Sequence, residues 1–132
     1  MNIKQFHHIW LELPQGREKE AKAFYEGVLG AKEIARPHPF SDTGLWMELC
    51  GVQLHFGAET NEGLLDLQKS GRNFSERHFA LLIDDAKNAR RELQMKNITI
   101  KEGTPIAGMD RFSFRDPFHN KIELFSFDQP SS

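Results

Sequence analysis

The chain has 132 residues, of which 39% are hydrophobic and 27% charged, so it is long enough for one globular domain with its own core. Its 17 lysines and arginines nearly balance 19 aspartates and glutamates. We therefore expect no nucleic acid and no membrane as partner, because both select a strongly basic protein. No apolar run approaches the roughly 20 residues of a membrane span. The single cysteine, Cys50, excludes an internal disulfide framework and favours a cytoplasmic location.

In chain order, the first predicted element is a strand over residues 6–13, where side chains alternate between two faces. A helix follows, and Gly30 stands where a helix end favours a positive φ. Its apolar residues recur at the spacing of one helix face: Ala21, Phe24, Tyr25, Val28 and Leu29. Three short strands are then predicted at about 31–36, 44–50 and 52–58. We expect Cys50, between the last two, to be a small core residue.

The second half repeats this pattern at an offset of 70 residues, which places His78 on His8. A strand at 76–83 precedes a helix that Asp84 and Asp85 can cap and that Asn97 can end. Three further strands are predicted at about 98–103, 110–115 and 120–127.

These elements predict an α+β fold in a single domain, residues 1–132. Module one spans about 3–58 and module two about 76–127, each with the order strand–helix–strand–strand–strand. The polar, glycine-punctuated stretch 59–75 is interpreted as the linker between them.

Strand parity brings four chemically active side chains onto the faces that the helices do not cover. Alternate residues of a strand point to opposite faces, and in four strands one set is apolar enough to pack under a helix. The opposite sets contain His8, His55, His78 and Glu123. His8 corresponds to His78 and His55 to Glu123, so the four converge if the modules, or two chains, face each other.

Three imidazoles and one carboxylate form a borderline nitrogen and oxygen donor set. Such a set suits one divalent transition metal (Mn, Fe, Co, Ni or Zn), whereas calcium prefers oxygen and Cu(I) prefers thiolate. Four protein ligands on a six-coordinate metal leave two positions open, as catalysis requires. Glu123 lies in a strand that should be covered, and a buried carboxylate is costly unless it is paired or ligated.

Each of these residues also has an ordinary structural interpretation. His8 and His78 could be sheet-edge histidines, and His7 is the rival of His8 for ligation. His55 could instead be a hydrogen-bonding histidine of the pocket wall or a substrate contact. Arg111 could face the cavity and hold an anionic substrate, or lie exposed. The candidate substrate-binding residues are Trp10, Trp46, Gln53, Arg111 and Phe125.

Five segments together form a recognisable pattern: His8–Leu11, Ala23–Gly30, Met47–Phe56, His78–Leu81 and Phe112–Leu124. The pattern resembles the vicinal oxygen chelate superfamily, which includes glyoxalase I, fosfomycin-resistance proteins, extradiol dioxygenases and bleomycin-resistance proteins. The resemblance covers about residues 5–127. It is fairly specific for the superfamily and not specific for any one reaction.

The resemblance implies two βαβββ modules that form an open mixed-sheet barrel around a divalent metal. Matched position by position, the family's ligands fall on His8, His78 and Glu123, with His55 at the position of a fourth ligand. Glu123 would also be a catalytic group, because glyoxalase-type chemistry lets a metal-bound glutamate take a proton, and His55 would be the fourth ligand or a nearby base. In many short members two chains of a swapped homodimer share the site, and we expect a homodimer.

Some positions depart from particular family members. Trp10 stands where fosfomycin thiol transferases have a threonine, and their arginine-bearing C-terminal extension is absent, which argues against fosfomycin modification. His55 replaces a glutamate of glyoxalase I, and no glutathione-binding residues can be placed, which argues against methylglyoxal chemistry. His119 replaces a turn glycine, so that turn requires a strained φ or another turn type.

Two functional hypotheses follow. The first is a metal-dependent enzyme that activates a small oxygen-chelating substrate for lyase, isomerase or dioxygenase chemistry. The alternative is a metal-free protein that binds a small molecule or drug, as bleomycin-resistance members do. The full set of His8, His78 and Glu123 favours the enzyme, because a metal-free binder does not need it.

Overall fold

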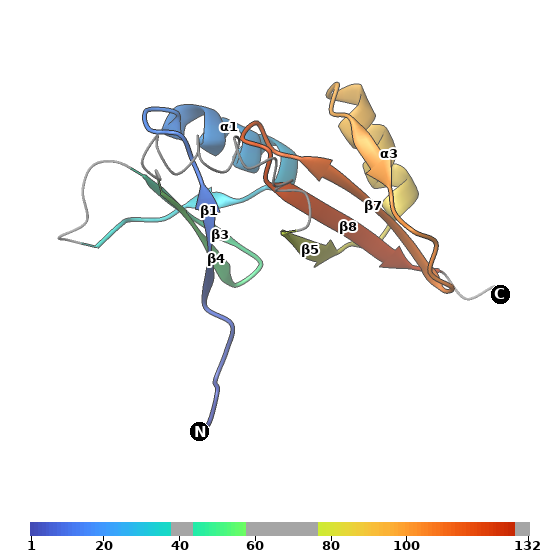
Figure 1. The fold of residues 1–132 in the computed structure, drawn as a ribbon, viewed down its shortest axis with the longest axis horizontal. Helices are drawn as coiled ribbons and strands as arrows, with labels where there is room; N and C mark the ends of the chain where they lie inside the picture. The colour runs from blue at the N-terminus through green and yellow to red at the C-terminus, as the bar shows by residue number, and fades with distance from the viewer. Residues whose placement is uncertain (38–43, 58–76, 129–132) are drawn as a thin grey trace, which may run out of the picture. The chain divides into compact units, whose positions relative to one another are not determined.

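The computed structural model describes residues 1–37, 44–57 and 77–128 (Figure 1). The chain divides into two compact units, Met1–Arg72 and Asn73–Ser132. One predicted module falls in each unit, and the predicted linker, 59–75, lies outside the described residues.

The first unit is a four-stranded sheet with one described helix. Its strands have the order β1-β4-β3-β2; β1 is parallel to β4, and the other neighbours are antiparallel. The elements in chain order are β1 (His8–Glu12), α1 (Glu18–Leu29), β2 (Lys32–Glu33), β3 (Leu45–Leu49) and β4 (Val52–Gly57).

The helix α1 covers the apolar face of this sheet. Ala21 and Tyr25 of α1 are fully buried, and the Tyr25 ring meets the Phe56 ring of β4 edge-on at 4.8 Å between centroids. Gly30 ends the helix in the left-handed conformation, with φ of 71°, which confirms the predicted helix end. Its N–H donates to the Glu26 carbonyl.

The turn between β3 and β4 corrects one prediction. Leu49 pairs with Val52, so the turn has two residues, Cys50 and Gly51, with φ of 52° and 81°. Positive φ at both positions is the geometry of a type I′ hairpin turn. Cys50 is therefore exposed at the tip of the hairpin, and the prediction of a core residue was wrong because the turn leaves it no sheet face.

The second unit repeats the same arrangement. Its strands have the order β5-β8-β7-β6, with β5 parallel to β8 and the other neighbours antiparallel. In Figure 1 the helix α3 lies along one face of β7 and β8. The elements are β5 (His78–Leu82), α3 (Ala86–Met95), β6 (Ile100–Glu102), β7 (Met109–Arg115) and β8 (Lys121–Phe127).

The ends of α3 confirm the predicted caps. The Asp85 side chain accepts a hydrogen bond from the backbone N–H of Asn88 at 3.1 Å, which is the bond of an N-cap. Asn97 follows the last helical turn with φ of 59°. Ser126 of β8 fixes the start of the helix to the sheet, because its buried Oγ accepts from the Ala86 N–H at 3.0 Å.

A buried aspartate organises the turn between β7 and β8. Asp116 Oδ1 accepts from the backbone N–H groups of Phe118 and Asn120, both at 2.8 Å, and its Oδ2 accepts from the Asn120 side chain. His119 takes a φ of 71° inside this turn, which is the first of the two predicted alternatives, a strained φ or another turn type. The turn fixes how β7 and β8 pair.

The predicted fold class is confirmed. The described residues form two helices and two four-stranded mixed sheets, and each unit has the order βαβββ. Each sheet is open, since its edge strands are not paired with each other. Within the described part of the chain, no helix has the length and apolar character needed to cross a membrane.

An arginine on α3 holds β6 and β7 from the helix side. Arg90 donates to Glu102 at 2.8 and 3.0 Å and to Asp110 at 2.5 and 2.9 Å, and its guanidinium lies 4.9 Å from the Phe112 ring centroid. The hydrogen bond from Arg90 lowers the pKa of Asp110 below its ordinary value. The pKa of Arg90 itself is raised, mainly by the same bond.

We expect Arg90→Gln to lower the free energy of unfolding by about 1–3 kcal/mol. The Asp110 pair should dominate, because the Glu102 side chain is 63% exposed and exposed pairs contribute little. Since the pKa of Asp110 is lower in the folded state, the pair stabilises the protein above about pH 4 and is lost as the pH falls below it. Urea unfolding of both proteins at several pH values would measure this. A difference that stays constant down to about pH 3 would contradict the assignment.

Candidate functional site

The predicted strand parity holds in both sheets. In β4, Leu54 and Phe56 are buried on the helix side, and in β8 so are Ile122 and Leu124. The predicted site residues alternate with these core residues along their strands. They therefore lie on the two sheet faces that the helices leave uncovered, two ligand candidates in each unit.

In the first unit, His8 and His55 lie in a stack of three rings. The His55 ring lies 3.7 Å from the Trp46 ring with 4° between their planes, and 4.1 Å from the His8 ring with 15° between planes. These residues come from the neighbouring strands β1, β4 and β3. His55 is in the middle of the stack and only 8% exposed.

The other contacts of these imidazoles define their roles. His55 Nε2 lies 2.9 Å from the Gln53 side-chain oxygen, which can only accept, so the histidine nitrogen donates. Burial, followed by the nearby His8, lowers the pKa of His55 and so favours its neutral form. His8 Nδ1 lies 2.9 Å from Nδ1 of His7.

The stack limits which of the two histidines can bind a metal. A metal lies close to the plane of an imidazole that binds it, because the nitrogen lone pair lies in that plane. The His8 and His55 planes are nearly parallel and separated, so the two rings do not converge on one ion in this arrangement. The His55 Nε2 is also bonded to Gln53.

Trp10 lies at the edge of the same face and is 48% exposed. Its indole packs directly on the backbone of Gly57, at the end of β4. A Cβ at Gly57 would lie 2.6 Å from Trp10 Nε1 and 3.1 Å from its Cε2. The absence of a side chain at Gly57 is therefore what lets the indole lie there.

In the second unit, His78 and Glu123 lie on adjacent strands, β5 and β8. His78 Nε2 is 3.8 Å from Glu123 Oε2, and their side chains are 35% and 14% exposed. The pair is diagonal, since Glu123 pairs directly with Ala80 and His78 with Lys121. Both predicted ligands of this unit therefore meet.

This separation fits two ligands of one metal. Two donors that each lie ~2.1 Å from a metal are about 3.0 Å apart at a right angle and about 3.4 Å apart at a tetrahedral angle. The observed 3.8 Å therefore requires only a small side-chain adjustment. The donor types, imidazole and carboxylate, are those that Mn, Fe, Co, Ni and Zn accept.

Arg111 binds the other oxygen of the same carboxylate. Its Nε donates to Glu123 Oε1 at 2.6 Å, and its Nη2 lies 2.5 Å from that oxygen. Its Nη1 donates to the Thr104 carbonyl at 3.0 Å. Glu123 thus has one oxygen on Arg111 and the other beside His78.

Phe125 continues this face along β8. It pairs with Leu82 of β5 and Arg111 of β7, and its ring meets the Phe127 ring at 5.8 Å, edge to face. Leu82 and Phe127 are 59% and 57% exposed. The charged part of the face therefore borders an apolar part.

The described residues contain no group of three or more His, Cys, Asp or Glu side chains arranged to hold a metal. The four predicted metal ligands form two pairs, one in each unit. His8 stacks on His55 in the first unit, and His78 lies beside Glu123 in the second.

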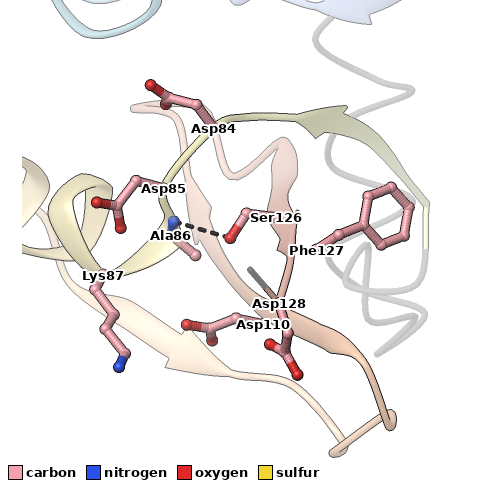
Figure 2. A pocket seen from close by; sticks show the side chains of 8 residues that line it. All are labelled: Asp84, Asp85, Ala86, Lys87, Asp110, Ser126, Phe127 and Asp128. Atoms are coloured by element: carbon pink, nitrogen blue, oxygen red, sulfur yellow. Dashed lines mark hydrogen bonds between the residues drawn. The ribbon is translucent and has the colours of Figure 1, made fainter. Parts of the chain in front are cut away.

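A hollow of about 610 Å³ lies elsewhere in the second unit, at the start of α3 (Figure 2). Two of its four acidic side chains have structural partners, because Asp85 caps α3 and Asp110 binds Arg90. Ser126, at its centre in Figure 2, binds the Ala86 N–H. Its lining is Asp84, Asp85, Ala86, Lys87, Asp110, Ser126, Phe127 and Asp128.

Comparisons with known proteins place these two modules in a family. Residues 5–124 match the model of the Glyoxalase/Bleomycin resistance protein/Dioxygenase superfamily. No curated protein matches the sequence significantly.

Solved structures share the fold over nearly the whole chain. A glyoxalase family protein from Bacillus anthracis is 27% identical with a TM-score of 0.79, covering 97% of this chain and 98% of its own. FosX, a fosfomycin resistance protein from Listeria monocytogenes solved with Mn(II) and sulfate, is 15% identical with a TM-score of 0.72, covering 97% and 93%. TnmS3, an antibiotic-binding protein from Streptomyces sp. CB03234, is 19% identical with a TM-score of 0.69, covering 97% and 99%.

We expect Gly57→Ala to displace the Trp10 indole, because the added Cβ would overlap it, and to destabilise the protein by about 1–3 kcal/mol. In a Trp46→Phe background Trp10 is the only tryptophan, so its fluorescence should shift to the red as the ring enters water. The control is Gly27→Ala in α1, where a Cβ meets nothing within 4 Å and an alanine favours the helix. Unchanged Trp10 emission in Gly57→Ala would show that the indole does not lie on Gly57.

Proposed function

We propose, since the chain belongs to the glyoxalase/bleomycin resistance protein/dioxygenase superfamily, that it is a metal-dependent enzyme acting on a small oxygen-chelating substrate. The observation that supports this most is the pair His78 and Glu123, with Nε2 and Oε2 3.8 Å apart on adjacent strands. The proposal takes His8 from the sequence prediction as the third ligand. The metal is one divalent ion among Mn, Fe, Co, Ni and Zn.

The superfamily and the fold make a resident metal reasonable. FosX, which shares the fold, was solved with Mn(II). Bound here, such an ion would supply a Lewis acid that stabilises negative charge developing on the substrate oxygens. That chemistry fits lyase, isomerase or dioxygenase reactions.

We place His55 behind His8 and outside the ligand set. Its Nε2 donates to Gln53 and its ring is enclosed between Trp46 and His8. Those contacts hold the ring in one plane, and His8 packs on that plane. In this proposal Gln53 and Trp46 act on the site through His55.

The remaining predicted residues form the surroundings of the substrate. Trp10 offers a half-exposed indole beside the ring stack, and Phe125 offers an apolar surface beside Arg111. The homodimer remains part of the proposal, and exposed Leu82 and Phe127 provide apolar surface for it in the second unit.

A second candidate is a metal-free protein that binds a flat small molecule. The stack of Trp46, His55 and His8, with Trp10 at its edge, favours it, because stacked rings bind planar ligands by further stacking. TnmS3, which shares the fold, is described as an antibiotic-binding protein.

We expect the chelator-stripped protein to bind one metal per chain when Mn²⁺, Fe²⁺, Co²⁺, Ni²⁺ and Zn²⁺ are titrated calorimetrically. Glu123→Ala and His78→Ala should each weaken binding about 100-fold or more, because each removes a direct donor. The control is His55→Phe, which keeps a ring in the stack and removes no metal donor, so it should weaken binding clearly less than Glu123→Ala or His78→Ala does.

Two outcomes would change the account. An equal loss of affinity in His55→Phe, with its thermal unfolding unchanged, would restore His55 to the ligand set. No saturable metal binding by the folded parent protein would remove the metal-dependent enzyme and leave the metal-free binding protein.

A further inference from the structure

The uncovered face of the second sheet is strongly basic. We call it the basic face; its cations are Lys101, Arg111, Arg115 and Lys121. Among the strand residues on this face, Glu123 is the one carboxylate. Four cations against one anion contrast with the chain as a whole, whose net charge is −2.

The strand register places these residues on one face, because directly paired residues of adjacent strands share a face. Glu123 pairs with Ser113, and Ser113 pairs with Lys101. Lys121 pairs with both His78 and Arg115.

Arg111 lies in the next row and pairs with Phe125. The cations therefore surround the His78 and Glu123 pair.

The matching face of the first sheet is not basic. The same register gives it one lysine, Lys32, and two carboxylates, Glu12 and Glu48. The two units share a topology, so the fold does not require the positive charge of the basic face.

The Arg111 guanidinium is held in a position where it can bind an anion. Its side chain is 24% exposed and crosses the backbone of Gly103, where a Cβ would lie 3.1 Å from Arg111 Cζ. Thr104 and Glu123 fix the guanidinium from two directions. A guanidinium has five N–H groups, and two of them, on Nη1 and Nη2, meet no acceptor among the described residues.

The neighbours of Arg111 indicate what accompanies the anion. Arg111, Phe125 and Leu82 form one row across β7, β8 and β5. A substrate with an anionic group on Arg111 therefore has an apolar surface beside it.

We propose that the substrate is a small oxyanion, a carboxylate or phosphate-type group on an apolar body, and that Arg111 binds its anionic end. This rests on the proposed function for the reaction, but anion binding itself does not require the metal. Paired oxygens of such a group match the planar guanidinium fork. Glu123 then has opposite effects on the two ligands: it binds the metal, and it competes with the oxyanion for Arg111.

The test is a titration of the metal-stripped protein with inorganic phosphate, and separately with acetate, at low ionic strength and with chelator present. We expect saturable phosphate binding that Arg111→Gln weakens about tenfold or more and that Arg111→Lys weakens less. Glu123→Gln should tighten phosphate binding severalfold, because it removes the competing charge, while it weakens metal binding strongly. The acetate arm shows whether a single carboxylate suffices.

The control is Arg91→Gln on the exposed side of α3, which makes the same change of charge away from the basic face. Equal weakening by Arg91→Gln and Arg111→Gln would overturn the proposal, and so would absence of phosphate binding in both the parent and Glu123→Gln. Circular dichroism of each variant checks that it is folded. Phosphate binding without metal binding would overturn the proposed enzyme and support the oxyanion site. Metal binding without phosphate binding would support the proposed enzyme and overturn the oxyanion site.

Discussion

The chemistry of the second unit depends on the placement of one carboxylate. Glu123 lies between Arg111, which binds its Oε1, and His78, which faces its Oε2. Three strands create this arrangement, because β8 runs parallel to β5 and antiparallel to β7. The Asp116 turn fixes the antiparallel register and Arg90 fixes β7 and β6 from the other side. Arg111 and His78 thus hold the Glu123 carboxylate in a defined orientation.

The two units use the same topology for different surfaces. In the first unit, the uncovered sheet face presents stacked rings, with His55 enclosed between Trp46 and His8. In the second unit, the equivalent face presents charges around Glu123. The same topology thus places an imidazole, His55, and a carboxylate, Glu123, at corresponding strand positions in the two units.

Much of the fold was predictable because its signals are local. Alternation marked the strands, Gly30 and Asn97 marked helix ends that need positive φ, and Asp85 marked an N-cap. Local pattern misplaced Cys50, because the parity of β3 does not continue into a two-residue turn. Parity also placed His8, His55, His78 and Glu123 on the sheet faces where the structure has them.

The contacts among these candidates were not predictable in the same way. The Arg111 pair with Glu123 and the His78 pair are diagonal, so they depend on the register between strands, which parity does not give. The hydrogen bond from His55 to Gln53 joins residues two apart on one strand. The sequence shows this spacing, but the bond also depends on the orientation of the His55 ring in the stack, which the sequence does not show. Sequence identifies the donors, and register decides which donors meet.

The central claim is that His8 and His78 are the histidine ligands of one metal and that His55 is not. The most direct measurement is ¹⁵N NMR of histidine-labelled protein during titration with Zn²⁺, with ring signals assigned by single substitutions. The account predicts that ring nitrogens of His8 and His78 shift together and saturate at one ion per chain, while His55 keeps its signals. A shift of His55 along with them, or no shift of any imidazole, would contradict it.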